Sequence, residues 1–126
     1  MQYVISASLL LAALIHILPI SGVFGLNSVA KLYGVAVTDN NTEILLRHRA
    51  VLFGLLGACF ALAAMFPVLR PFAFGAGLIS TVSFLVVARS VGGYNRQLSR
   101  VVAADIIAMA SLAIGLVLHV LADGGA

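Results

Sequence analysis

The sequence has very little charge. Only 9% of its 126 residues are Asp, Glu, Lys or Arg, whereas 63% are hydrophobic. Soluble domains carry about a quarter charged residues, so a water-soluble fold is excluded. Intrinsic disorder is excluded as well, because disordered chains combine low hydrophobicity with high charge. The remaining class is a small integral membrane protein, with the lipid bilayer as its surroundings.

Cysteine and clusters of basic residues are scarce too. Cys59 is the single cysteine, so the chain cannot form an intrachain disulfide or a cysteine-based metal site. Seven Lys and Arg residues give a net charge of +3, but they are scattered among apolar runs and form no surface that follows a phosphate backbone. We therefore expect no metal site and no nucleic-acid partner.

Four apolar stretches are long enough to cross a bilayer, which takes roughly 20 residues. They cover residues 3–24, 44–66, 71–91 and 98–121, and the one substantial loop covers residues 28–42. Pro67 and Pro71 predict a tight turn between the second and third stretches. Gly92, Gly93 and Asn95 predict the end of the third. The fold class is therefore an all-α membrane protein, with residues 1–126 forming a single domain of four transmembrane helices in an antiparallel bundle.

The basic residues indicate the orientation of this bundle. Chain order places six of the seven on one face, with Arg70 alone on the other. Lys and Arg in short flanks stay on the cytoplasmic side, so we expect the charged face to be cytoplasmic and both termini to be outside. The first stretch has neither a basic leader nor an A-x-A-like cleavage site, which predicts a retained helix rather than a signal peptide.

Stripes of small and polar residues predict which helix faces pack together. In the second stretch we expect Arg47 to face inward, above a stripe formed by Gly54, Gly57, Ala58, Ala61 and Met65. In the fourth stretch the stripe begins at Asp105 and continues through Ala108, Ser111, Leu112, Gly115 and His119. A carboxylate inside the membrane boundary needs a cation, and Arg47 is the first candidate to pair with Asp105.

The other two stretches carry stripes of their own. The third has Ala76, Ser80, Ser83, Val87, Ser90 and Tyr94 in line, and the first has Ser8, Ala12, His16 and Pro19 on one broad face. Pro19 should kink the first helix just beyond His16. In the loop, Thr42 with Glu43 or Asp39 is expected to cap the second helix.

The candidate ligand-binding residues gather at the cytoplasmic end. They are Arg47, His48, Asn95, Asp105, His16 and Tyr94, and a guanidinium among them suits a carboxylate or phosphate group. Arg47, Arg49 and Arg89 also lie close enough to the interface to snorkel to lipid headgroups. Asp105 has a structural ion pair as its alternative role. His16 is either a hydrogen-bonded interhelical residue, a ligand or proton-relay residue, or an axial haem ligand. We predict no cofactor, with haem through His16 or His48 as the alternative.

Several short motifs carry a resemblance to a known group. They are Leu32 to Gly34 (LYG), Leu45 to Gly54 (LLRHRAVLFG), Gly93 to Asn95 (GYN), and Arg100 with Val101 followed by Asp105. Together they resemble a group of small bacterial four-helix inner-membrane proteins without an established biochemical role, distantly similar in layout to DoxX-like proteins. The resemblance covers most of the chain and implies this topology and this membrane. Some members carry the label phosphopantetheine adenylyltransferase, but the His-x-Gly-His motif and α/β pattern of that enzyme are missing here.

Three functions compete at this point. The first is a binding module, or a small enzyme, for an anionic amphiphile whose head meets the cytoplasmic cluster while its tail lies between the helices. The second is a small-molecule or proton-coupled transporter that works as an oligomer, although four-helix multidrug transporters use a Glu in the first helix, where this chain has His16. The third is a structural or assembly subunit. Four helices of this size bury little core alone, so we expect a homo-oligomer.

Overall fold

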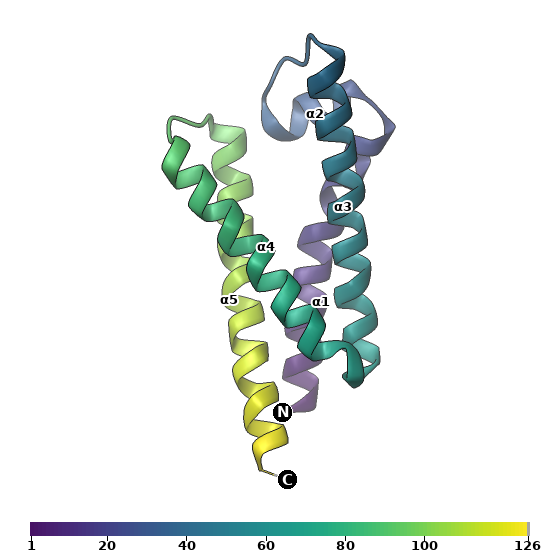
Figure 1. Cartoon of the computed structure of the whole chain (residues 1–126), viewed down its shortest axis with the longest axis vertical. Coiled ribbons are helices and arrows are strands. Elements are labelled where there is room, and N and C mark those ends of the chain that lie inside the picture. The colour runs from purple at the N-terminus through teal and green to yellow at the C-terminus, as the bar shows by residue number, and fades with distance from the viewer. Residues whose placement is uncertain (126) are drawn as a thin grey trace.

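The computed structural model describes residues 1–125, and these contain helices and turns but no strand. Four long helices dominate and are joined by shorter elements (Figure 1). In chain order the elements are α1 (Gln2–Ile17), η1 (Leu18–Phe24), α2 (Leu26–Tyr33), α3 (Asn40–Met65), η2 (Pro67–Leu69), α4 (Arg70–Val91) and α5 (Arg96–Gly124), where η marks a 3₁₀ helix. The four expected apolar helices are confirmed.

Four segments are long and apolar enough to cross a membrane. They are Gln2–Phe24, Asn40–Met65, Pro67–Val91 and Arg96–Gly124. Many large apolar side chains on them point away from the protein, including Leu55, Ile79, Val86 and Val117, each more than half exposed. A soluble monomer rarely exposes apolar surface on this scale, so the outer faces of the helices require an apolar environment.

The connection after α1 differs from the expected kink followed by a loop. The α-helix ends at Ile17, and Pro19 opens the 3₁₀ helix η1, as its missing N–H group and fixed φ angle allow. The segment expected to be a loop, residues 28–42, contains most of the short helix α2. Gly34 ends α2 with a left-handed φ of 62°, and a Cβ there would lie 2.7 Å from the Gln97 side chain. Only glycine suits this close approach.

Two side-chain caps start the helices that follow the long connections. Oδ1 of Asp39 accepts a hydrogen bond of 2.8 Å from the backbone N–H of Thr42, which confirms the expected cap on α3. Oδ1 of Asn95 accepts a bond of the same length from the backbone N–H of Leu98 at the start of α5. Each cap satisfies a backbone donor that has no partner within its own helix.

The core lies between α1, α3 and α5, and the first half of α4 completes it. Its largest apolar members are Ile5 and Leu9 of α1, Phe60 of α3, Phe74 of α4 and Leu112 of α5. The stripe predicted on α5, from Asp105 to His119, is buried throughout. Ser111 of that stripe donates a hydrogen bond of 2.9 Å to the Ser8 carbonyl, which fixes the register of α5 against α1.

The stripe predicted on α3 is only partly correct. Gly54 and Gly57 are buried as expected, and Gly57 allows α1 to approach so closely that a Cβ would lie 2.6 Å from Ile17. Ala58 and Met65 are exposed instead, and Phe60 occupies the core. The large ring sets the rotation of α3, because burying Phe60 contributes more than burying a small residue.

Arg70 closes the end of the bundle where both termini lie. Its side chain is buried, with 3% of the residue exposed. The sequence predicts only that Arg70 is the single basic residue at this end, and not that it is buried. Its guanidinium donates to the Ala63 carbonyl at 3.3 Å, to Ser6 Oγ at 3.1 Å and to Gln2 Oε1. Ser6 Oγ in turn donates to the Ala64 carbonyl at 3.0 Å. One arginine therefore ties α1, α3 and α4 together.

Candidate functional site

The opposite end of the bundle is open between α3 and α4. Toward that end α4 diverges from α3 and runs beside α5 (Figure 1). α4 packs inward through Ala73, Phe74, Gly77 and Thr81. Its predicted polar stripe does not pack inward as expected, because Ser80, Ser83 and Val87 line a groove toward α3. The divergence of the two helices leaves this stripe without a partner helix.

Three adjoining hollows make up this opening, which we call the α3–α4 groove. Their volumes are about 480, 260 and 620 Å³, and the first and third fall within the range of small-molecule sites. The first two lie between the helices, and the third lies under the α2–α3 connection and the turn between α4 and α5. Arg49 of α3 lines all three hollows, and the remaining lining is mostly apolar.

Arg49 is held in place by aromatic rings. Its guanidinium carbon lies 4.6 Å from the ring centre of Phe53, 5.0 Å from that of Phe84 and 5.7 Å from that of Tyr33. Its Nε donates to the Tyr33 hydroxyl at 3.2 Å. The two terminal nitrogens have no hydrogen-bond partner within residues 1–125. The rings stabilise the cation and fix its plane, while its strongest donors stay available to an anion.

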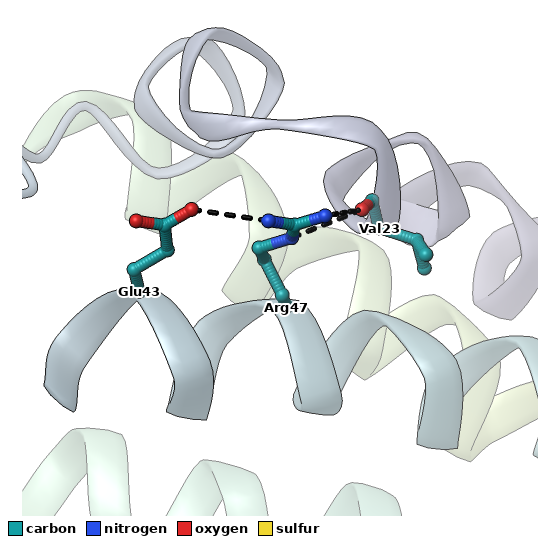
Figure 2. Close-up of polar contacts among 3 residues, drawn as sticks. All are labelled: Val23, Glu43 and Arg47. Atoms are coloured by element: carbon teal, nitrogen blue, oxygen red, sulfur yellow. Dashed lines mark hydrogen bonds and ion pairs between the residues drawn. The ribbon is translucent and has the colours of Figure 1, made fainter. Parts of the chain in front are cut away.

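Arg47 is bonded to η1 and to its own helix rather than to Asp105, the partner expected for it. Figure 2 shows its guanidinium directed at η1, where Nε and one terminal nitrogen donate to the Val23 carbonyl at 3.1 and 2.9 Å. The other terminal nitrogen pairs with Glu43 at 3.1 Å. The expected pair with Asp105 is therefore not formed. η1 lies over this face of α3 and presents a carbonyl group without an N–H partner, which the arginine satisfies.

Three of the candidate ligand-binding residues line the α3–α4 groove: His48, Tyr94 and Asn95. His48 is exposed on its α3 side, and Tyr94 lines the hollow beneath the connecting segments. Asn95 lines that hollow too, but its Nδ2 donates to the carbonyls of Tyr33 and Gly34 at 2.9 and 3.1 Å. With its oxygen capping α5, Asn95 fixes the wall of the groove and has no free polar atom to offer a ligand.

Asp105 and His16 belong to the interior of the bundle, on the other side of Phe53. Asp105 is 4% exposed and lines a separate cavity of about 250 Å³ between α1, η1, α2, α3 and α5. Asp105 forms no ion pair with Arg47 or with another basic side chain among residues 1–125. His16 is fully buried, stacked on Phe53 at 5.3 Å and edge-on to Phe60 at 5.0 Å.

Sequence reasoning missed the central residue of the groove. Arg49 was expected to snorkel, whereas it occupies an aromatic cage. One signal was present, because Phe53 follows Arg49 by four residues and therefore lies on the same face of a helix. The contributions of Tyr33 and Phe84 come from distant segments, and no local pattern announces them.

Comparisons with known proteins give no match. No protein-family model, no curated protein and no solved structure is similar to this chain. Within residues 1–125, no group of three His, Cys, Asp or Glu side chains is placed to hold a metal ion. The assignment of a function therefore depends on the geometry of the groove.

Proposed function

We propose that this chain is an integral membrane protein that binds an anionic amphiphile in the α3–α4 groove. The four long helices insert as an antiparallel bundle in a bacterial inner membrane, with the groove at the cytoplasmic face and both termini outside. The exposed apolar side chains of the long helices support insertion. Besides Arg49, five basic residues lie toward the same end, on α2, at the start of α3 and beside the α4–α5 turn: Lys31, Arg47, Arg89, Arg96 and Arg100. This asymmetry supports the orientation.

The head of the ligand binds Arg49, and this is the observation on which the proposal depends. A guanidinium that is half-buried among three rings, with two unpaired terminal nitrogens, suits the planar, bidentate geometry of a carboxylate or phosphate. The apolar surroundings strengthen such a bond relative to one in water. Tyr94 and His48 border the groove on either side of Arg49 and contribute polar atoms at its rim.

The tail of the ligand lies along the groove between the two helices. Leu45, Leu52 and Leu56 of α3 line the first hollow of the groove, and Val87 of α4 lines the second. Ser83 donates to its own helix, to the Ser80 carbonyl at 2.9 Å, so this hydroxyl makes no demand on the ligand. An acyl chain can enter from the bilayer because the groove is open between α3 and α4, and burying it stabilises the complex by roughly 0.8 kcal/mol per CH₂ group.

Native mass spectrometry of the protein in a non-ionic detergent tests the proposal. The probe is lysophosphatidic acid, and lysophosphatidylcholine with the same tail is the comparison ligand. We expect one bound lysophosphatidic acid per chain and at least tenfold weaker binding of the zwitterionic ligand. Arg49→Met should weaken binding of the acid about tenfold, which corresponds to about 1.4 kcal/mol, the contribution of one charge-assisted pair.

Arg89→Met is the matched control, because Arg89 is exposed near the same end of the bundle and does not line the groove. Its binding should equal that of the wild type. Equal losses in both variants would indicate a general effect of surface charge and would contradict a specific site. The same measurements on the three proteins with laurate as the ligand, if they give the same outcome, would extend the ligand class from phosphates to carboxylates.

A further inference from the structure

One buried carboxylate in the bundle lacks a positive partner. Asp105 of α5 is 4% exposed, and its side chain forms no hydrogen bond and no ion pair among residues 1–125. Its Oδ2 atom is fully enclosed and has no partner in that part of the chain. A water molecule can donate a hydrogen bond to such a group but leaves its charge unbalanced, and an unpaired charge away from bulk water is costly. Asp105 therefore favours a cationic donor as its neighbour.

Asp105 lines the cavity of about 250 Å³ between α1, η1, α2, α3 and α5, which we call the Asp105 cavity. Most of its lining is apolar, and the polar exceptions besides Asp105 are Lys31, Gln97 and Arg100. All three are exposed, whereas Asp105 is buried, so the cavity runs inward from a polar mouth to the carboxylate. Sites for drug-sized ligands hold about 300–1,000 Å³, so the Asp105 cavity suits a smaller molecule.

The cations at the mouth are held away from Asp105. Arg100 precedes Asp105 on α5 and lies about 7.5 Å nearer the start of the helix, on a different side of it. Lys31 comes from α2 and forms no ion pair among the described residues. α1 and η1 contribute no charged residue to the cavity, and Arg49 of the α3–α4 groove does not line it. An apolar passage therefore separates a negative charge at the inner end from two positive charges at the mouth.

We propose that the Asp105 cavity binds a small amphoteric molecule, with an ammonium group at its inner end, a carboxylate at its outer end and an apolar chain between them. The ammonium donates to Asp105, and the carboxylate pairs with Lys31 and Arg100 at the mouth. A molecule with a single charge leaves one end of the cavity unmatched, so charge complementarity selects the amphoteric class.

The spacing of the charges indicates the length of this molecule. Arg100 and Asp105 are separated by about 7.5 Å along the axis of α5, at 1.5 Å per residue. An extended chain of about five methylene groups spans this distance, whereas an α-amino acid carries both charged groups on one carbon atom. The favoured ligand is therefore an ω-amino acid. This site is separate from the α3–α4 groove and does not rest on the function proposed for the groove.

Isothermal titration calorimetry of the protein in a non-ionic detergent tests the site, with 6-aminohexanoate as the probe. We expect one molecule to bind per chain. Norleucine is an isomer of the probe whose two charged groups share one carbon atom, and hexanoate lacks the ammonium group. Each should bind at least tenfold more weakly than 6-aminohexanoate. Failure of 6-aminohexanoate to bind, or equal binding of norleucine or hexanoate, would overturn the proposal.

Asp105→Asn tests the inner end of the cavity. The substitution keeps the shape of the side chain and removes its charge, so the preference for 6-aminohexanoate over hexanoate should disappear. Asp123→Asn is the matched control, because Asp123 lies at the other end of α5 with 69% of its side chain exposed. The control should keep the full preference. A preference that persists in Asp105→Asn, or that is lost in Asp123→Asn, would contradict a site at Asp105.

A second variant avoids any folding defect of Asp105→Asn. Lys31 and Arg100 are exposed, so the double variant Lys31→Met and Arg100→Met leaves the core intact. It should bind 6-aminohexanoate at least tenfold more weakly, but it should not weaken binding of hexylamine, which has no carboxylate. Loss of both ligands, or of neither, would overturn the proposal.

Competition with lysophosphatidic acid separates this site from the α3–α4 groove. Arg49 lines the groove and not the Asp105 cavity, so a saturating concentration of the lipid should leave the affinity for 6-aminohexanoate unchanged. Displacement of 6-aminohexanoate by the lipid would place the probe in the groove and overturn a separate site. Failure of the lipid to bind would instead count against the groove alone.

Discussion

Two arginines at opposite ends of the bundle show how one residue type can close a structure or leave it open. Arg70 is buried, and each part of its guanidinium donates to a neighbour on α1 or α3. Arg49 is also partly buried, but its neighbours are rings that offer no acceptor apart from the Tyr33 hydroxyl. The first arginine is fully used in holding helices together. The second keeps hydrogen-bonding capacity that the fold does not consume.

The packing of the helices also differs between the Arg70 end and the Arg49 end. At the Arg70 end, η2 is a single short turn, and it holds α3 and α4 together. At the Arg49 end, α4 leaves α3 (Figure 1), and the longer connections around α2 and Gly92 line the third hollow. Stability should therefore be concentrated at the end with the termini, and binding at the other. The predictions below test this division, from the largest expected effect on stability to the smallest.

The largest loss should follow from Arg70→Met. The substitution removes three hydrogen bonds and leaves the buried carbonyl of Ala63 without its donor. We expect a loss of about 3 kcal/mol in the free energy of unfolding, because a buried group loses its partner and cannot reach water. Thermal unfolding in detergent, followed by circular dichroism, measures it. Arg89→Met should change little, and an equally small effect of Arg70→Met would contradict a closed end.

A pair of glycines in α4 gives the second test. A Cβ at Gly77 would lie 2.7 Å from the Phe60 ring and 2.8 Å from Leu112, whereas a Cβ at Gly75 meets no described atom within 4 Å. Gly77→Ala should therefore destabilise the protein by about 2 kcal/mol through overpacking. Gly75→Ala should stabilise it by up to about 1 kcal/mol through helix propensity. The same unfolding measurement compares the two, and similar values would show that α4 does not pack tightly against α3 and α5.

The helices could be predicted because their signals are local. Apolar length, the prolines near residue 70 and the glycines at 92 and 93 mark the spans and their ends without reference to the rest of the fold. The buried stripe of α5 was predicted correctly too, since a regular helix repeats its face. The faces of α3 and α4 were not, because the ring of Phe60 and the divergence of α4 decide them.

The site was harder to predict, because its geometry depends on contacts between distant segments. Three consecutive residues of α3 had to be assigned to different directions, and the stripe of small residues on the same helix favoured Arg47 over Arg49 as the inward one. The 3₁₀ helix η1 decides the matter by presenting the Val23 carbonyl to Arg47, and nothing in residues 18–24 announces that position. The buried network of Arg70 was missed for the same reason, since its partners lie 64 and 68 residues away.

Arg49→Met tests how much the open end contributes to the stability of the fold. Contacts of a cation with aromatic rings contribute about 0.5–1 kcal/mol each at partly exposed sites, and removing the half-buried charge from its apolar surroundings offsets much of this. We therefore expect the free energy of unfolding to change by no more than about 1 kcal/mol, much less than for Arg70→Met. Unfolding of the two variants under one condition makes the comparison direct. A loss as large as that of Arg70→Met would mean that the aromatic cage is structural.

The smallest effect should be at Asp39, the exposed cap of α3 at the open end. Hydrogen bonds from the hydroxyl and the backbone N–H of Thr42 hold the pKa of its carboxyl below the ordinary value. Because the pKa is lower in the folded state than in the unfolded state, the carboxylate stabilises the fold above the unfolded pKa, and this contribution is lost as the pH falls through the folded pKa. Asp39→Asn keeps the cap without a charge, so its unfolding temperature should lack this decline in acid. A series of unfolding temperatures between neutral and acidic pH checks the prediction, and parallel curves for the two proteins would contradict it.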